Sequence, residues 1–230
     1  MAIYICGDTH GEIDIKKLYR TGRTIMNKLT PKDYLIILGD FGGIWDGSIW
    51  DDELLNWYEE QPYTILFVDG NHENHFLLNK YPVETWCGGK IHRIRQNVFH
   101  LMRAQLFTIE GKTFLTMGGA CSIDKAYRTQ GIDWWAGEVA TDKERQALYH
   151  LVEATDKVDY ILTHCAPTTV LHRLSASYRR DEMTDLMDSI YYNIDFSHWY
   201  FGHYHMHMDF EDRFGNKFHA RYNIVEELKE

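Results

Sequence analysis

The sequence predicts an α/β fold whose sheets mix parallel and antiparallel strands, and three observations lead to this prediction. Short runs of apolar, β-branched and aromatic residues recur along the chain. Helix-like stretches separate several of these runs, as expected when strands and helices alternate. Two further segments have the turn residues of β-hairpins. The length of 230 residues suits one large domain, so we expect a single domain over residues 1–230.

Six runs have the composition of buried strands, because near-continuous apolar segments are expected where a sheet is covered on both faces. They are residues 2–6, 34–38, 64–68, 113–117, 160–163 and 199–201. Helices are expected between some of them, over residues 12–28, 52–60 and 141–154.

Two hairpins are expected as well. The first pairs residues 99–102 and 105–109 with residues 112–117 and turns at Glu110-Gly111. The second pairs residues 206–211 with residues 217–223 and turns near Phe214-Gly215. Glycine supplies the positive φ that tight hairpin turns need. Antiparallel strands are therefore expected beside the parallel ones.

The composition narrows the class of function. The formal net charge is −10, and an acidic surface repels phosphate backbones, so we expect no extended nucleic-acid footprint. A phosphorylated small molecule, a nucleotide or a phosphoprotein stays compatible as a substrate, because bound cations invert the local field of a pocket.

Nothing in the sequence suggests export or a membrane partner. No signal peptide is visible, and no apolar run approaches the roughly 18 residues that span a bilayer. The four cysteines form no CxxC pair and no evident disulfide framework. We therefore expect a cytoplasmic protein with reduced thiols.

Polar side chains follow five of the expected strands at the point where each strand ends. The first three strands are followed by GDTHG, GD and DGNHE, and the last two by H and GHYH. Ligands of open α/β sheets bind beside the carboxyl ends of the strands, so these groups are expected on one rim. The candidate metal ligands are Asp8, His10, Asp40, Asn71, His164, His203 and His205.

These residue types indicate a metal centre. Asp, Asn and His without Cys suit Mn, Fe, Zn or Mg. Seven ligands are too many for one tetrahedral zinc site and suit two metal ions that share a carboxylate. Asp8 and His10 are one residue apart, as are His203 and His205, and in an extended segment such pairs point to the same side. We expect two divalent cations, with Mn²⁺ as the first choice.

Taken together, the motifs resemble those of the calcineurin-like metallophosphoesterase superfamily. GDxH, GNH and GHxH occur in this order between Asp8 and His205, which covers nearly the whole chain. The resemblance implies a four-layer α/β/β/α sandwich with two mixed sheets. It divides the ligands between two metal ions: Asp8, His10 and His205 for the first, Asn71, His164 and His203 for the second, with Asp40 bridging both.

The resemblance also implies roles for two neighbouring residues. His72 matches the family histidine that contacts the phosphate and protonates the leaving group. Asp69 precedes the same motif and is expected to orient His72. The Ser/Thr protein phosphatases of the family carry GDxVDRG at the second motif, whereas Asp40 is followed by Phe41-Gly42-Gly43. The arginine that would grip phosphate there is missing, so a protein phosphatase fits less well.

The phosphate and the leaving group need other contacts. Residues 118–128 are similar to a segment of small bacterial and phage members of the superfamily, which predicts a lid or substrate wall. Arg128 is a candidate for a bidentate phosphate contact, with a surface salt bridge as the alternative. Trp134 or Trp135 is a candidate for stacking on a base or another aromatic group, with core packing or a partner surface as the alternative.

The predicted function is a dinuclear metal-dependent phosphoesterase that hydrolyses phosphomonoesters or phosphodiesters. A metal-bridging hydroxide would attack phosphorus, and His72 would assist the leaving group. One alternative is a nuclease or nucleotide phosphodiesterase that acts on short nucleic acid. Another is a non-catalytic metal-binding scaffold. The histidines outside the motifs receive no role: His75, His92, His100, His150, His172, His198, His207 and His219.

Overall fold

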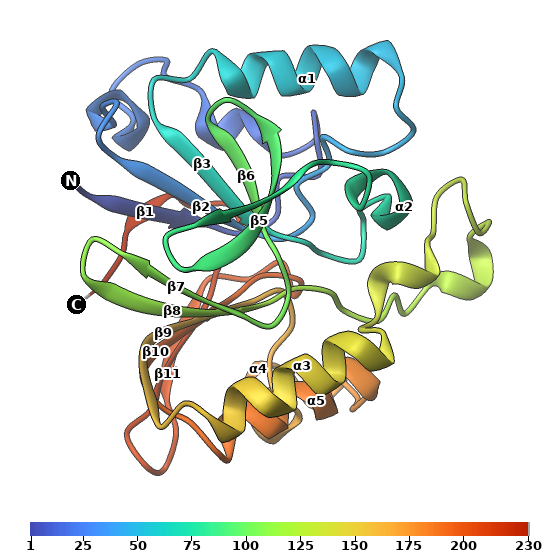
Figure 1. Ribbon diagram of the computed structural model, residues 1–230, viewed down its shortest axis with the longest axis vertical. Helices are drawn as coiled ribbons and strands as arrows, with labels where there is room; N and C mark the ends of the chain where they lie inside the picture. Colours follow the sequence, from blue (N-terminus) through green and yellow to red (C-terminus); the bar gives the residue numbers. More distant parts are fainter. Residues whose placement is uncertain (230) are drawn as a thin grey trace.

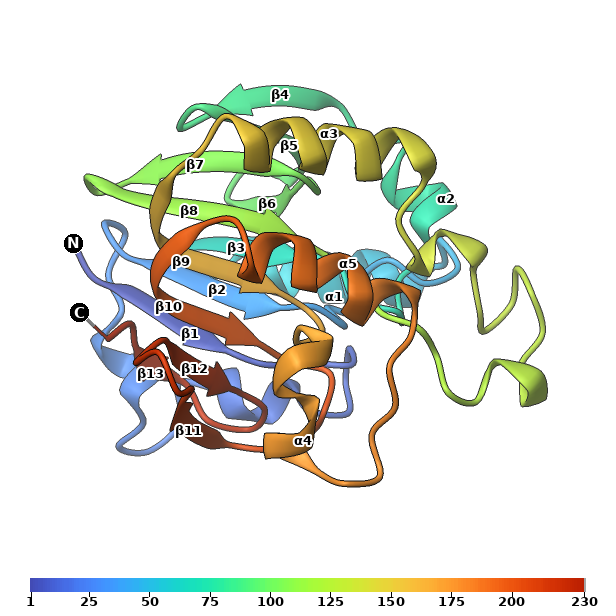
Figure 2. The ribbon, with the colours of Figure 1, turned by 90° about the horizontal axis from the view of Figure 1, so that it is seen from below.

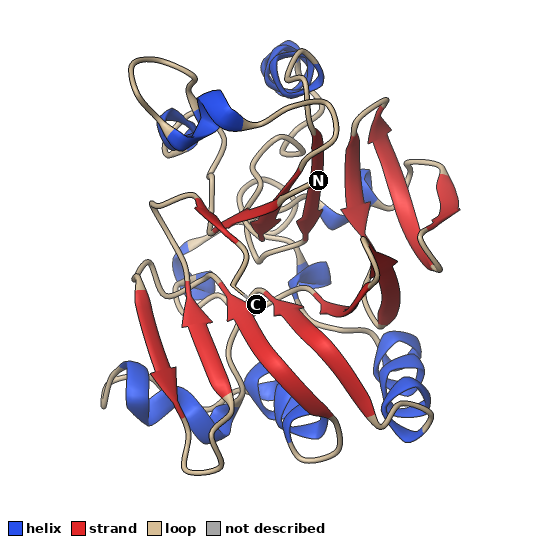
Figure 3. Cartoon of the chain, turned by 90° about the vertical axis from the view of Figure 1, so that its left-hand side faces the viewer, coloured by secondary structure: helices blue, strands red, loops and turns tan. Residues whose placement is uncertain are grey.

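The apolar runs of the sequence form two β-sheets that pack face to face, with helices on the outer face of each sheet, in the computed structural model of residues 1–229 (Figure 1). The architecture is therefore mixed α/β with two mixed sheets, as the sequence predicts. Figure 3 shows the two groups of strands side by side, with helices flanking them.

The first sheet has seven strands in the order β13-β1-β2-β3-β6-β5-β4. Four neighbouring strands are parallel: β1 (Ile3–Cys6), β2 (Tyr34–Leu38), β3 (Thr64–Val68) and β6 (Val98–Leu101). Antiparallel strands complete both edges: β5 (Gly89–Arg95), β4 (Val83–Trp86) and β13 (Glu226–Glu227).

The second sheet has six strands in the order β11-β12-β10-β9-β8-β7. Its parallel strands are β8 (Lys112–Met117), β9 (Lys157–Thr163), β10 (Asp195–Phe201) and β12 (Lys217–Ala220). The antiparallel edges are β7 (Gln105–Ile109) and β11 (Met208–Glu211). Both contribute to the hairpins expected with β8 and β12.

In the central strands of the first sheet, neighbouring side chains enter different buried clusters, because successive side chains of a strand point to opposite faces. Ile37 of β2 belongs to a buried cluster with Leu55 and Tyr58 of α1 (Ile49–Glu59). Its neighbour Ile36 belongs to a second cluster, with Leu162 of β9, between the two sheets. The strands are therefore covered on both faces, which explains their near-continuous apolar sequences.

A third cluster lies outside the second sheet. There α3 (Asp142–Glu153), α4 (Leu171–Leu174) and α5 (Glu182–Tyr191) contribute buried apolar side chains. Thr141 begins α3 with a capping box to Glu144, which satisfies backbone N–H groups of the first turn. The three clusters separate four layers in the order helix, sheet, sheet, helix.

Two sequence predictions are wrong. Residues 12–28 form two short 3₁₀ helices, η1 (Ile15–Leu18) and η2 (Ile25–Lys28), and Gly22 between them has φ +70°. Residues 99–102 do not join the hairpin with β8, because β6 pairs with β3 and β5 in the other sheet. The chain crosses to the second sheet just before β7, where Ala104 has φ 54°. The turn at Glu110-Gly111 has positive φ at both residues, as in type I′ hairpins.

The topology brings the ends of five strands to one rim. Figure 2 shows the arrowheads of β1, β2, β9 and β10 on the same side of the molecule. On that side, the segment between β8 and α3 extends away from the body; it contains η3 (Lys125–Tyr127) and η4 (Ala136–Glu138). Within residues 1–229, none of the helices has the length and apolar character needed to cross a membrane.

Candidate metal centre and substrate pocket

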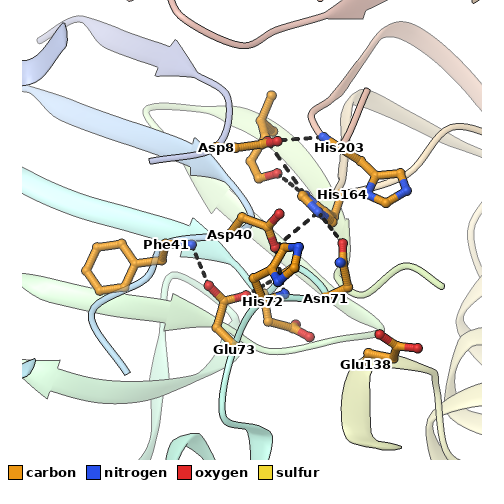
Figure 4. Close-up of polar contacts among 12 residues, drawn as sticks. Asp8, Asp40, Phe41, Asn71, His72, Glu73, Glu138, His164 and His203 are labelled. Carbon is orange, nitrogen blue, oxygen red and sulfur yellow. Dashed lines mark hydrogen bonds and ion pairs between the residues drawn. The ribbon is translucent and has the colours of Figure 1, made fainter. Parts of the chain in front are cut away.

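The loops that follow β1, β2, β3, β9 and β10 bring the predicted ligands of both sheets together. Figure 4 shows Asp40, Asn71 and His164 pointing toward one another, with Asp8 and His203 beside them. Asp8, His10 and His205 each offer an atom within 4.8 Å of the others, and so do Asp8, Asp40 and His164. Both groups contain Asp8.

One half of the centre consists of Asp8, His10 and His205. His10 Nε2 lies 3.2 Å from Asp40 Oδ2, and His205 Nε2 lies 3.2 Å from Asp8 Oδ2. Asp8 is completely buried, and its Oδ2 has no hydrogen-bond partner. An anionic oxygen in that position needs positive charge nearby, either on a protonated His205 or on a metal ion, because an unpaired buried charge is strongly destabilising.

The other half of the centre, as the resemblance divides it, consists of Asn71, His164 and His203. His164 is fully buried, and its Nε2 lies 3.1 Å from Asn71 Oδ1 and 3.3 Å from Asp40 Oδ1. Its Nδ1 lies 2.6 Å from the carbonyl oxygen of Leu38, so Nδ1 must donate there. The ring of His203 packs edge-on against His164, with 5.1 Å between centroids.

The chemistry of these donors fits a metal ion. Nδ1 of His164 carries a proton, so in a neutral ring Nε2 would carry only a lone pair. That lone pair would face two oxygen atoms, Asn71 Oδ1 and Asp40 Oδ1. Only a cation between these atoms relieves that repulsion, whether a proton or a metal ion. Burial alone would lower the pKa of His164, but the charge of Asp40 raises it to about 10. The centre therefore requires positive charge where His164 Nε2, Asn71 Oδ1 and Asp40 Oδ1 meet.

Asn71 is oriented by a chain of two hydrogen bonds. Its Nδ2 donates to Ser122 Oγ at 3.0 Å, and Ser122 Oγ donates to Glu138 Oε2 at 2.5 Å. The amide nitrogen is therefore turned away from His164, and Oδ1 is left facing the centre. Ser122 and Glu138 are buried and lie in the segment between β8 and α3.

Glu73 connects the loop that carries Asp40 to the loop that carries Asn71. Its carboxylate accepts hydrogen bonds from the backbone N–H groups of Phe41, Gly42 and Gly70 (Figure 4). Burial, and then the nearby charge of Asp40, raise the pKa of Glu73 to about 8, although the bond from Gly70 opposes this. Glu73 belongs to the GNHE motif, but the sequence predicts no role for it.

The ligand-bearing loops are not extended, in contrast to the sequence prediction. His10, Asp40, His203 and His205 have φ angles of 44°, 48°, 65° and 49°. Residues other than glycine rarely adopt this left-handed conformation, and each instance costs on the order of 1–3 kcal/mol. The other non-glycine residues with positive φ in residues 1–229 are Cys87, Ala104 and Glu110.

Two glycines of the motifs are required by close packing. A Cβ at Gly70 would lie 2.1 Å from Asp40 Oδ1, and a Cβ at Gly202 would lie 2.2 Å from Asp8 Oδ1. Such distances are impossible for any other residue. The backbone after β3 and β10 can therefore approach the two buried carboxylates only because these positions are glycine.

Two residues that the sequence does not predict support the half of the centre that contains Asp8, His10 and His205. Asp14 Oδ2 accepts from His10 Nδ1 at 2.8 Å, which turns Nε2 toward Asp40. The ring of Tyr222 stacks on His205, with centroids 4.5 Å apart, and its hydroxyl lies 3.2 Å from the Asp14 carboxylate. Carboxylates that hold the far nitrogen of a ligand histidine fix the ring orientation and raise its basicity.

His72 lies at the border between the centre and a pocket. Its backbone N–H donates to Asp40 Oδ1 at 2.8 Å, and its ring centroid is 5.8 Å from that of His10. Burial lowers the pKa of His72, and the positive charge of Arg128 adds to this effect against the opposing charge of Asp40. His72, His10 and Arg128 line one pocket of about 530 Å³.

Asp69 does not take the position that the sequence predicts. Its Oδ1 lies 3.1 Å from His100 Nε2, and its Oδ2 lies 3.2 Å from His75 Nε2 and 2.9 Å from Arg103 Nε. Burial would raise the pKa of Asp69, but Arg103 and the histidines hold it well below its usual range. Both carboxylate oxygens are used by these residues, so Asp69 is not brought to His72. It instead connects the end of β3 to residues 100–103.

The two predicted substrate residues differ in position. Arg128 lines the pocket beside His72 and also pairs with Asp124, with its Nε 2.8 Å from Oδ1. Trp134 is half-buried and is not among the residues that line this pocket. The neighbouring Trp135 packs edge-on against Trp45, as the core-packing alternative predicts. Trp45 and Trp50 line the pocket instead.

Comparison with known proteins supports the geometry. The family model described as calcineurin-like phosphoesterase matches residues 1–207. No curated protein sequence matches the chain.

Among solved structures, a candidate 5′-nucleotidase from Staphylococcus aureus is similar, with a TM-score of 0.53, 14% identity, and coverage of 97% of this chain and 49% of that one. The chain thus spans about half the length of that protein. A phosphopantetheinyl hydrolase from Mycobacterium tuberculosis is also similar, with a TM-score of 0.48 and 16% identity. The match covers 96% of this chain and 90% of that chain. The first likeness is one of fold.

Proposed function

The chain belongs to the calcineurin-like phosphoesterase family, and we propose that it hydrolyses phosphate esters with two divalent cations held at the rim of its two sheets. The family makes it a metal-dependent phosphoric ester hydrolase. The proposal adds the number of metal ions, their ligands and the part that His72 plays.

One observation carries the proposal. His164 must donate from Nδ1 to the carbonyl of Leu38, while its Nε2 faces oxygens of Asn71 and Asp40. The amide of Asn71 is in turn fixed by Ser122, so it offers an oxygen and not a nitrogen. Such an arrangement requires positive charge at Nε2, from a second proton or from a metal ion, and the convergence of ligand atoms from the loops after β2, β3 and β9 supports the metal ion.

We assign the ligands in two groups that share one carboxylate. Asp8, His10 and His205 would hold one cation, Asn71, His164 and His203 would hold the other, and Asp40 would contact both. When bound, such cations supply positive charge to the phosphoryl oxygens and acidify a water molecule. Manganese is our first choice, because carboxylate, amide and imidazole ligands suit it.

His72 would act on the leaving group. Its ring lies between the candidate ligands and the pocket that also contains Arg128. As a water oxygen forms a bond to phosphorus and its proton passes to solvent, the ester P–O bond breaks and a proton from the imidazolium form of His72 neutralises the leaving oxygen. Arg128, which lines the same pocket, would contact a phosphoryl oxygen as a charge-assisted donor.

The test compares metal-stripped and manganese-reloaded protein on nitrophenyl phosphate and on bis-nitrophenyl phosphate. We expect turnover only after reloading, and metal analysis should give about two ions per chain. The ratio of the two rates distinguishes a phosphatase from a phosphodiesterase. Asp195→Asn, which changes an exposed carboxylate at the start of β10, is the matched control and should behave as the parent protein.

The protein could bind two ions and still turn over neither ester and no short single-stranded oligonucleotide. That result would contradict hydrolysis and favour a metal-binding scaffold. Binding of a single ion would contradict the dinuclear assignment. A single domain over residues 1–230, a cytoplasmic location, and a small-molecule, nucleotide or phosphoprotein substrate stay predictions.

A further inference from the structure

The pocket beside His72 has walls that the hydrolytic chemistry does not use. Its volume is about 530 Å³, within the size range of small-molecule sites. His10 and His72 line it at the end next to the candidate metal centre. A group that leaves from phosphorus would therefore enter this pocket, since His72 faces both spaces.

One wall of the pocket is apolar and aromatic. Trp45, Trp50, Ile13 and Leu54 contribute to it. Trp50 is 68% exposed and Ile13 is 76% exposed. Trp45 is held in place because Trp135 packs against it, with ring centroids 4.7 Å apart. Large apolar side chains gathered around a concave surface next to reactive groups are typical of a ligand site.

The remaining side chains give the pocket a negative rim. Glu12, Asp46 and Asp51 line it, whereas Arg128 is the only lysine or arginine that does so among the described residues. The carboxylate of Asp51 accepts from the backbone N–H groups of Trp45 and Gly47 at 2.7 and 2.8 Å, which fixes its position. Arg128 is already paired with Asp124. A leaving group with its own phosphate would therefore meet the exposed carboxylates of Glu12 and Asp46.

We propose that this pocket is the leaving-group subsite and that it selects a phosphate ester whose alcohol carries a planar, uncharged aromatic ring system, with a nucleoside as the natural example. The indole of Trp50 provides an open face on which such a ring stacks, and stacking accepts any base. The acidic rim excludes leaving groups that carry further phosphates. This inference rests on the proposed function for catalysis, but binding of the ring does not depend on turnover.

The first experiment measures kcat and KM for two esters and one anhydride on manganese-loaded protein: adenosine 5′-monophosphate and ribose 5-phosphate are the esters, and adenosine 5′-diphosphate, whose terminal phosphoryl group leaves adenosine monophosphate behind, is the anhydride. We expect kcat/KM for the monophosphate to exceed that for ribose 5-phosphate by about tenfold or more, from stacking alone. The diphosphate should be the poorer nucleotide, because its leaving group carries a phosphate. Equal values for the monophosphate and ribose 5-phosphate would overturn the proposal.

Variants locate the effect. Trp50→Ala should lower the ratio of kcat/KM between adenosine monophosphate and ribose 5-phosphate by about tenfold, and Trp50→Phe should restore most of it. The matched control is Phe214→Ala, which removes an aromatic side chain of similar exposure, 66%, from the turn between β11 and β12. A ratio that is unchanged in Trp50→Ala, or equally changed in Phe214→Ala, would contradict the assignment.

A binding measurement separates the two proposals. Adenosine without phosphate should quench the tryptophan fluorescence of the parent protein and not that of Trp50→Ala. If no ester is hydrolysed but this quenching is seen, the subsite stands and the proposed function fails. If esters are hydrolysed but adenosine neither quenches nor inhibits, the proposed function stands and the subsite fails.

Discussion

The two halves of the candidate metal centre use similar ligands but hold them by different means. His164 is fully buried, and its far nitrogen bonds to a backbone carbonyl inside the fold. The side chain of His205 is 50% exposed and rests on the ring of Tyr222. We call the half with His164 the buried half and the half with His205 the exposed half: His164 is held inside the fold, whereas His205 is held by a side chain from a loop.

This difference indicates which half is the more easily lost. A ligand in a packed core has few alternative rotamers, whereas an exposed histidine must be ordered each time a cation binds. We therefore expect two binding events of unequal affinity, the weaker at Asp8, His10 and His205. Calorimetric titration of metal-stripped protein with Mn²⁺ measures both, and the variant His205→Ala identifies the weaker one by removing it.

The largest effect is expected where the two halves meet. Asp40→Asn removes the charge that both share, so both binding events should weaken and activity should fall by more than the roughly 10–100-fold that loss of an outer partner costs. Metal analysis and nitrophenyl phosphate turnover measure this change. A variant with full activity and two bound ions would show that the halves are independent.

The next effect should be confined to the buried half. Glu138→Gln weakens the anchor of Ser122, which lets the amide of Asn71 turn over, so the tighter binding event should weaken toward the upper end of about 10–100-fold. We would measure it in the His205→Ala background, where only that event remains. An affinity of the remaining event that is unchanged by Glu138→Gln would contradict the comparison.

A smaller effect is expected from the exposed half. Asp14→Asn removes the carboxylate that accepts from His10 Nδ1, so the weaker event should lose about tenfold in affinity, near the lower end for such partners. Added to His205→Ala, the same substitution should leave the remaining event unchanged. A loss there would mean that Asp14 supports both halves.

The smallest effect tests the aromatic support of His205. Tyr222→Phe removes the hydroxyl that contacts Asp14 but keeps the ring on His205, so the weaker event should change by no more than a few-fold, about 1 kcal/mol. Tyr222→Ala, which removes the stack as well, should cost more. Equal effects of the two substitutions would show that the ring contributes nothing to the position of His205.

The sequence predicts the strands well because buried apolar clusters cover them on both faces, which makes their sequences almost continuously apolar. Residues 34–38 and 64–68 are β2 and β3 with the predicted bounds. The helix predicted over residues 12–28 fails because its apolar residues serve two short turns separated by a left-handed glycine. The position of β6 depends on which sheet its buried residues can enter, and no local pattern shows that.

The candidate ligands are predictable for a related reason: each directly follows a strand, so local order determines where it lies. Glu73 has a sequence signal, since it follows the GNH motif. Tyr222 and Glu138 have none, because they reach the centre through the tertiary arrangement of segments distant in sequence. Asp69 shows the converse limit: proximity in sequence to His72 does not bring the two side chains together.

The left-handed backbone conformation of four candidate ligands limits how the thermal stability of this protein can be increased. At Glu110, in the turn between β7 and β8, asparagine or glycine suits the positive φ better than glutamate and should relieve strain without touching the centre. Strain cannot be relieved in the same way at four candidate ligands, because the substitution that relaxes the backbone also removes the ligand. These are His10, Asp40, His203 and His205. A heat-resistant variant must therefore keep its most strained residues and gain its stability elsewhere.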